Sequence, residues 1–272
     1  MRINVGGLIG SFGDLKFSLD DITRQATMWK LDHILIANIS AASRDVGGND
    51  MNEPEANFAA LKAAQGDARL QPLYWLRPGR KDCHLAAVQG AMQSAPFVGL
   101  VLAPGLNEIS LSDPIVDGAL EIAGKLELPV IVRIGDDGAW NASRVAALAR
   151  EHPRVRFVLS GIARHGDVRH ASEILRKAQS RGEISLFGDT ASCSPDIALE
   201  FIRLAGAERV LLSLEECHDK EHAGLSPSRL QEHLELNLRK SEYDAVMGRN
   251  ALTLFRRLRP SVAKPVSAAN AK

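Results

Sequence analysis

The sequence predicts a single α/β domain folded as a (β/α)8 TIM barrel, and three observations support this fold class. The chain has 272 residues, which suits one large domain better than two small ones. Short apolar segments alternate with amphipathic segments from one end to the other, and a barrel of this kind typically has about 250 residues. The rival fold is a doubly wound open sheet, but the sequence has neither a G-x-G-x-x-G turn after a strand nor a Walker A loop.

Eight segments are predicted to be strands that are buried on both faces. They are short, rich in Val, Ile and Leu, and apolar on both sides, as strands of a parallel sheet are. The predicted strands are residues 2–6, 33–39, 70–76, 97–102, 129–134, 155–160, 184–187 and 209–213. The first strand, in the sequence RINVGGLIG, is expected to run into a glycine-rich turn.

Helical patterns lie between these strands. Ser18 precedes two acidic residues, and Asp113 precedes Pro114. Both are typical helix starts, because a polar side chain can cap the first turn and proline fits there. The expected helices are residues 19–31, 52–65, 82–94, 114–127, 141–151, 170–181, 194–204, 226–238 and 241–258. We expect the barrel to span residues 1–258, and the small, polar tail of residues 259–272 to be disordered.

The composition excludes several classes of partner. Lys+Arg and Asp+Glu number 33 each, so the formal charge gives no footprint for nucleic acid or an anionic membrane. No apolar run approaches the roughly 20 residues that span a bilayer. The three cysteines are few, scattered and odd in number, which fits a reducing cytoplasm. We expect a cytoplasmic protein that binds a small molecule, and the pattern leaves homo-oligomerisation open.

Four segments together carry a family resemblance. They are PVIVRIG at 129–135, VRFVLSG at 155–161, GAERVLLS at 206–213 and RNALTLF at 249–255. These segments resemble the amidohydrolase superfamily, and in particular its branch of small metal-dependent TIM-barrel hydrolases and decarboxylases. The resemblance covers about residues 2–258. It implies chemistry at the carboxyl ends of the strands, where histidines and an aspartate hold a divalent ion that activates water.

The residues of this sequence at the implied metal positions are different. The resemblance implies paired histidines on strand 1, a lysine or histidine near strand 4, histidines on strands 5 and 6, and an aspartate after strand 8. The matching residues are Gly6 and Leu8, Val101 or Ala103, Arg133, Gly161 or Ser160, and Glu215. No histidine stands at any of these places, and glycine, leucine, valine, alanine and arginine do not ligate metals. The sequence predicts an inherited fold whose metal centre has been lost, with no cofactor.

Several polar residues remain at predicted strand ends and are candidates for ligand binding. Arg133 could clamp a carboxylate or phosphate with two hydrogen bonds; an equally weighted alternative is a buried ion pair with Glu215. Arg77 follows two aromatic residues and could line a pocket, although a solvated loop residue is the more frequent role. The predicted ligand-binding residues are Arg133, Arg77, Asp136, Asn4 and Asp189.

Two residues are candidates for acid–base chemistry. His165 follows the sixth strand and Glu215 follows the eighth; His165 can also be read as part of a surface loop. If a metal ion is present, Asp136, Glu215 and His218 could hold it. An oxygen-rich set of this kind suits Mg²⁺ or Mn²⁺ better than Zn²⁺.

Three functions follow from this sequence. The first is a non-catalytic, amidohydrolase-related barrel that binds a small anion at its mouth or serves as a partner subunit. The second is a hydrolase or decarboxylase with one divalent metal ion (Mn, Mg or Zn) on relocated ligands. The third is a metal-free lyase or isomerase that uses Arg133, His165 and an acid. The fold alone does not choose among them.

Overall fold

The structure is a computed structural model that describes residues 1–42, 51–78, 84–107, 110–134, 141–162, 168–183, 185–214 and 227–258. The predicted tail at 259–272 lies outside these residues. Among the described helices, none has the length and apolar character needed to cross a membrane.

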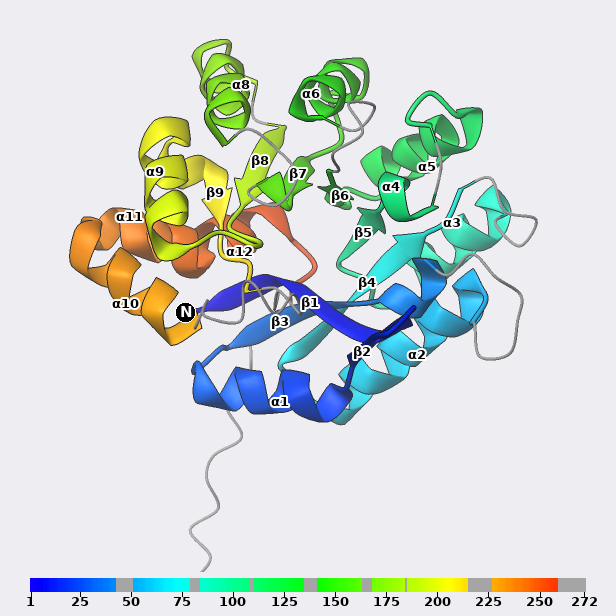
Figure 1. Cartoon of the computed structure of the whole chain (residues 1–272). Helices are drawn as coiled ribbons and strands as arrows, with labels where there is room; N and C mark the ends of the chain where they lie inside the picture. The colour runs from blue at the N-terminus through cyan, green and yellow to red at the C-terminus, as the bar shows by residue number, and fades with distance from the viewer. Residues whose placement is uncertain are drawn as a thin grey trace, which may run out of the picture.

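The described strands form one curled sheet in the order β2-β1-β3-β4-β5-β6-β7-β8-β9 (Figure 1). β2 (Leu15–Phe17) runs antiparallel to β1, and the other eight strands run parallel. The parallel strands are β1 (Ile3–Phe12), β3 (His33–Asn38), β4 (Leu70–Leu76), β5 (Gly99–Leu102), β6 (Val130–Arg133), β7 (Phe157–Ser160), β8 (Leu186–Asp189) and β9 (Val210–Leu211). The backbone N–H of Val5 donates to the carbonyl of Leu212 at 3.0 Å, which joins the first strand to the segment after the last. The predicted (β/α)8 barrel is confirmed, and each of the eight predicted strands is present.

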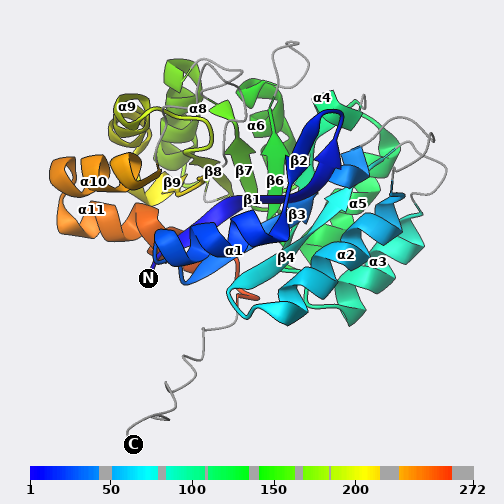
Figure 2. The ribbon, with the colours of Figure 1, turned by 60° about the horizontal axis from the view of Figure 1, so that its bottom comes forward.

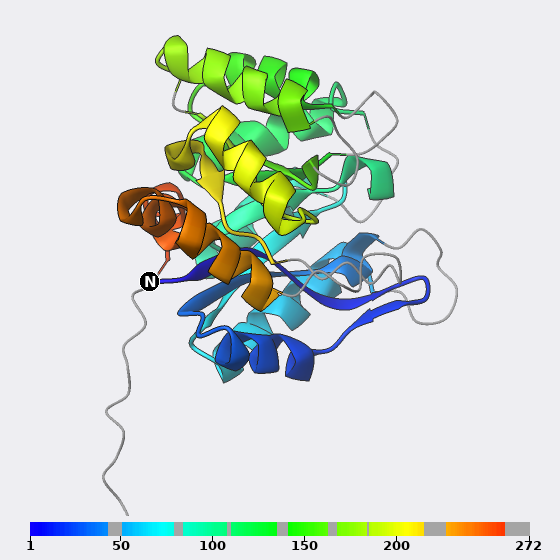
Figure 3. The ribbon, with the colours of Figure 1, turned by 60° about the vertical axis from the view of Figure 1, so that its left-hand side comes forward.

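The first strand corrects one expectation, because it does not end in a glycine-rich turn. β1 continues through Gly7 and Gly10 to Phe12 and forms a hairpin with β2 that extends past the neighbouring strands (Figure 3). A Cβ atom at Gly7 would lie 2.6 Å from Cγ2 of Ile34. Glycine is therefore required there by the close approach of β1 to β3, whereas the turn itself comes at Gly13, where φ is +56°.

The helices cover the outside of the barrel (Figure 2). They begin where the sequence predicts: Ser18 Oγ accepts the N–H of Asp21, and Asp113 Oδ1 accepts the N–H of Ile115. The longer helices are α1 (Leu19–Met28), α2 (Glu53–Gly66), α3 (Leu85–Ser94), α5 (Pro114–Lys125), α6 (Ala142–Glu151), α8 (Val168–Ser180), α9 (Pro195–Ala205) and α10 (Pro227–Asn237). Helices α8, α9 and α10 lie side by side along one flank (Figure 3). The sequence did not predict two short elements, η1 (Ile39–Ala42) and α4 (Pro104–Asn107).

The last part of the chain closes the amino-terminal end of the barrel, which we call the base. The single helix predicted for 241–258 is instead α11 (Lys240–Asp244), a π-helical turn η4 (Ala245–Arg249) and α12 (Asn250–Leu254). Asn250 Nδ2 donates to the carbonyls of Ala207 at 2.7 Å and Val210 at 2.8 Å, beside the 3-10 turn η2 (Ala207–Arg209) and the start of β9. Phe255 is fully buried and lies against Gly99, the first residue of β5.

Buried apolar residues form two groups, one on each face of the sheet. One group includes the apolar faces of the surrounding helices. The other collects alternate residues of the strands together with Phe255, and it fills the lumen. Members of this inner group on successive strands include Leu35, Leu73, Trp75, Val101, Ile131, Val158 and Leu211.

Candidate binding site at the barrel mouth

One row of residues crosses the carboxyl ends of five neighbouring strands. The registers pair Arg133 of β6 with Ser160 of β7. Continuing three further pairings by one residue adds Arg77 after β4, Ala103 after β5 and Asp189 of β8 to this row. These are the pairings of β4 with β5, of β5 with β6 and of β7 with β8. The row is Arg77, Ala103, Arg133, Ser160 and Asp189. We call it the rim row.

The rim row faces the lumen. Side chains alternate along a strand, so residues two positions apart point to the same side. Trp75, Val101, Ile131 and Val158 belong to the inner apolar group, and each stands two residues before a member of the rim row. The two arginines are two strands apart, which is about 10 Å at the usual strand spacing. Between them stands Ala103, whose methyl group occupies little of the mouth.

The two arginines differ in exposure. Arg133, the last residue of β6, is partly buried, whereas Arg77 is only 8% exposed. The alternative interpretation of Arg77 as a solvated loop residue does not fit this burial, and ligand binding by Arg77 stays a prediction. The alternative partner proposed for Arg133, Glu215, lies outside the described residues.

Asp189 ends β8 and is fully buried. Its Oδ1 accepts the N–H of Ala191 at 3.0 Å and that of Gly161 at 3.4 Å, and so ties the end of β8 to the end of β7. Burial, together with the nearby Asp189 charge, raises the pKa of the Cys193 thiol. This cysteine is therefore a protonated packing residue. Ligand binding by Asp189 stays a prediction.

Asn4 lies at the seam where the barrel closes. Its Oδ1 accepts the N–H of Gly6 at 3.0 Å and that of Leu214 at 2.9 Å, so one side chain connects β1 to the segment after β9. The side chain is 1% exposed. The structure gives Asn4 this seam role, and ligand binding by Asn4 stays a prediction.

Sequence reasoning missed a carboxylate beside the rim row. Glu53, the first residue of α2, is 1% exposed. Its Oε1 accepts the hydroxyl of Tyr74 at 2.7 Å, and its Oε2 accepts the backbone N–H of Arg77 at 2.6 Å. The one sequence signal for it was an acidic residue immediately after a helix cap, in the sequence Asn52-Glu53.

Four predicted residues cannot be placed. Asp136, His165, Glu215 and His218 lie outside the described residues. The structure thus brings Arg77, Arg133 and Asp189 into one row and sets Asn4 at the seam, while the predicted acid–base pair and the predicted metal ligands stay predictions.

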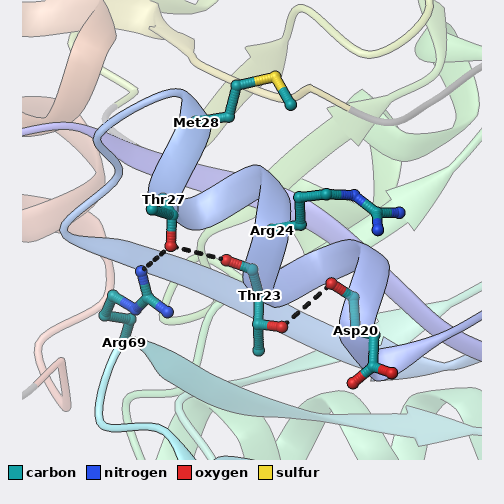
Figure 4. A pocket seen from close by; sticks show the side chains of 6 residues that line it. All are labelled: Asp20, Thr23, Arg24, Thr27, Met28 and Arg69. Atoms are coloured by element: carbon teal, nitrogen blue, oxygen red, sulfur yellow. Dashed lines mark hydrogen bonds between the residues drawn. The ribbon is translucent and has the colours of Figure 1, made fainter.

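A concave surface lies on the outside of the barrel, along the outer face of α1 and against Arg69, the residue before β4 (Figure 4). Its polar groups bond to one another: Arg69 Nη1 donates to Thr27 Oγ1 at 3.0 Å, and Arg69 forms an ion pair with Asp67 at 2.6 Å. The hydrogen bond from Arg69 lowers the pKa of Asp67. This groove follows a helix on the outside of the barrel, whereas barrel chemistry occurs at the carboxyl ends of the strands, so it is a poor candidate for the site.

Comparison with known proteins identifies the family. Residues 25–257 match the family described as Amidohydrolase. The chain belongs to the amidohydrolase family. Comparison with curated proteins finds none that matches.

Solved structures share the amidohydrolase fold of this chain. 2,6-Dihydroxybenzoate decarboxylase from Rhizobium has a TM-score of 0.70 at 14% identity, over 94% of this chain and 98% of that one. 5-Carboxyvanillate decarboxylase from Sphingomonas paucimobilis has a TM-score of 0.65 at 12% identity, over 94% and 98%. 4-Oxalomesaconate hydratase from Rhodopseudomonas palustris has a TM-score of 0.64 at 15% identity, over 95% and 96%. These likenesses establish the fold.

The implied metal positions can now be located on the amidohydrolase barrel. Gly6 and Leu8 lie in β1, and Val101 and Ala103 lie in and just after β5; Leu8, Val101 and Ala103 are buried apolar residues. With Arg133 and Ser160 they provide no imidazole, carboxylate or thiolate. Within the described part of the chain, no three His, Cys, Asp or Glu residues are grouped so that they could hold a metal ion. The described residues at the implied metal positions therefore do not fit the family's divalent metal, and the last implied position, Glu215, lies outside the described residues.

Proposed function

We propose that this amidohydrolase-related barrel lacks the usual His/Asp metal centre and binds a small anionic molecule at its mouth, without catalysing a reaction on it. The observation that carries this proposal is the rim row, in which Arg77 and Arg133 flank Ala103 on the lumen side. A guanidinium presents a planar fork of N–H donors that matches a carboxylate or a phosphate.

The names of the structural neighbours support a carboxylate as the anion. A dihydroxybenzoate, a carboxyvanillate and an oxalomesaconate all carry carboxylate groups. Arginines about 10 Å apart could contact two carboxylates of one small molecule. Such a pocket would keep the binding role of the barrel mouth after its metal chemistry was lost.

The competing function is a metal-dependent hydrolase or decarboxylase with ligands drawn from Asp136, Glu215 and His218. Metal analysis of the purified protein, after expression with added zinc and manganese, separates the two. About one equivalent of a divalent ion that survives dialysis would favour the competing function, because an ion held that tightly must be bound by ligands of the protein.

The binding proposal is tested by calorimetric titration of citrate, phthalate and inorganic phosphate into the protein. We expect binding of at least one carboxylate. Arg133→Ala should weaken binding by about tenfold or more, because a hydrogen bond to a charged group contributes about 1.5–3 kcal/mol. Arg150→Ala is the matched control, because Arg150 is exposed in the last turn of α6, at the end of the helix that points away from the rim row.

Two results would contradict the binding proposal. One is the absence of binding for all three anions. The other is equal affinity in the wild type and Arg133→Ala.

We place the protein in the cytoplasm, on the evidence of its three scattered cysteines.

A further inference from the structure

Among the described carboxylates beside the mouth, Glu53 is the most buried apart from Asp189. It is 1% exposed at the start of α2. A carboxylate removed from water is costly unless hydrogen bonds compensate for the lost hydration. The contacts that Glu53 makes are therefore informative about its role.

Both oxygens of Glu53 accept hydrogen bonds from the end of β4. Oε1 takes the Tyr74 hydroxyl at 2.7 Å, and Oε2 takes the backbone N–H of Arg77 at 2.6 Å. β4 ends at Leu76, so the N–H of Arg77 lies one residue beyond the strand. The acceptor for that N–H is a side chain of α2.

A second residue of α2 fixes the same segment. Asn57 Oδ1 accepts the N–H of Trp75 at 2.7 Å, and Asn57 Nδ2 donates to the carbonyl of Trp75 at 3.0 Å. The same Nδ2 donates to the carbonyl of Glu53 at 2.9 Å. Helix α2 therefore holds the backbone at residues 75 and 77, and so sets the direction in which the Arg77 side chain leaves the chain.

The contact with the Arg77 N–H requires a hydrogen-bond acceptor at position 53. An ionised carboxylate accepts hydrogen bonds at both oxygens, whereas a glutamine amide has one acceptor oxygen and an NH₂ group. Glutamine could therefore keep its oxygen on the Arg77 N–H and turn its NH₂ to Tyr74, whose hydroxyl can also accept. Leucine offers no acceptor, so Glu53→Leu is the substitution that breaks the contact.

We infer that Glu53 is a positioning residue, which holds Arg77 in the rim row in the orientation needed to bind the anion. This inference rests on the proposed function, because that function makes Arg77 a ligand-binding residue. It adds a residue that neither the sequence analysis nor the family resemblance assigns to the site. The anion itself does not contact Glu53.

The experiment compares Glu53→Leu, which removes the acceptor, with Tyr74→Phe in the full chain. Tyr74→Phe is the matched control, because it removes the other donor to the same carboxylate and leaves the Arg77 N–H in place. Two quantities are measured by NMR without ligand: hydrogen exchange of the Arg77 amide and ¹⁵N relaxation of Arg77 Nε. Citrate affinity is measured by calorimetry.

We expect Glu53→Leu to remove the exchange protection of the Arg77 amide, to increase the motion of Arg77 Nε, and to weaken citrate binding about tenfold. Tyr74→Phe should keep the protection of the Arg77 amide. In an Arg77→Ala background, Glu53→Leu should have no further effect on citrate affinity, because Glu53 acts through Arg77. A merely structural role would weaken binding in that background as well.

The outcomes separate this inference from the proposed function. If wild-type protein binds no citrate, the proposed function loses support, and the two NMR measurements still decide whether Glu53 orders Arg77. Unchanged protection and motion of Arg77 in folded Glu53→Leu would overturn the inference whatever the binding result. If Glu53→Leu does not fold, Glu53→Asp, which retracts the carboxylate by one methylene, is measured in the same way with the same criteria.

Discussion

The base and the mouth of this barrel differ in how closely they follow the amidohydrolase family. At the base, Asn250 and Phe255 belong to the segment RNALTLF that carries the resemblance, and both are buried and in contact with strand ends. At the mouth, the positions at which the resemblance implies metal ligands hold Gly6, Leu8 and Arg133. The chain therefore keeps residues of the resemblance at one end, whereas at these three positions of the other end it lacks the ligands that the resemblance implies.

This difference indicates which residues the family resemblance depends on. Asn250 satisfies two carbonyls beside β9, and Phe255 fills the lumen against Gly99; both tasks belong to the fold. A sequence can therefore match the family over most of its length because it keeps the residues that build the barrel. Activity depends on the few side chains at the opposite end.

The largest expected effect is at the base. Phe255→Ala should lower the free energy of unfolding by about 3–5 kcal/mol, because it removes a fully buried ring and leaves a cavity. Urea denaturation measures this loss. Phe58→Ala is the control, since Phe58 is 67% exposed on α2. Equal stability of the two variants would mean that Phe255 does not hold the base together.

Asn250→Ala tests the second contact at the base. It leaves the carbonyls of Ala207 and Val210 without their side-chain donor, so we expect a loss of about 1–3 kcal/mol in the free energy of unfolding. Asn237→Ala removes a similar bond from an exposed side chain to the His233 carbonyl and should change stability little. If the Asn250 variant were as stable as the Asn237 variant, the bonds of Asn250 to the two carbonyls would not stabilise the base.

The acid response of the base is a third test. Burial lowers the pKa of His33, at the start of β3, below its ordinary value of 6.5, and outweighs the opposing charge of Asp32. The unfolded chain then takes up a proton near pH 6.5 while folded His33 stays neutral. Stability from this group is present above pH 6.5 and is lost as the pH falls towards the folded pKa.

This acid response is measured as the urea midpoint between pH 8 and pH 5, in wild type and His33→Leu. We expect a smaller fall in the midpoint for the variant, because its side chain does not titrate. Parallel pH profiles for the two proteins would show that His33 makes no contribution.

The smallest expected effect concerns the mouth. If the metal centre has been lost, treatment with EDTA should leave the thermal unfolding midpoint unchanged, because no bound ion stabilises the folded state. Differential scanning calorimetry with and without chelator makes the measurement. A lower midpoint in EDTA that zinc or manganese restores would mean that a bound metal ion stabilises the folded protein, and would contradict the loss of the metal centre.

The sequence predicted the fold better than the site. Eight strands were found because strands buried on both faces are continuous runs of Val, Ile and Leu. The end of β1 was missed because Gly7 and Gly10 were read as a turn, whereas close packing on β3 is what requires Gly7. The π-helical turn was missed because its Val246 carbonyl accepts the N–H of Leu212, which is distant in sequence.

For the site, the sequence predicted Arg133 and Asp189 at strand ends, and the registers place both in the rim row. It missed Glu53, because the contacts of Glu53 with Tyr74 and Arg77 join residues 21 and 24 positions apart. Neither helical nor strand periodicity links residues at those separations. Such a contact becomes visible only when the helix is packed against the strand.

The seam between Asn4 and Leu214 has a consequence for synthesis of the chain. Its two residues are 210 positions apart, so at about 5–20 residues per second the ribosome needs on the order of 10–40 s to make the second after the first. During that interval β1 can pair with β2 and β3, which are translated soon after it, while its other edge waits for β9. The nascent protein can therefore exist for many seconds as an open sheet whose first strand has one unpaired edge, and closure of the barrel is a late event in its biogenesis.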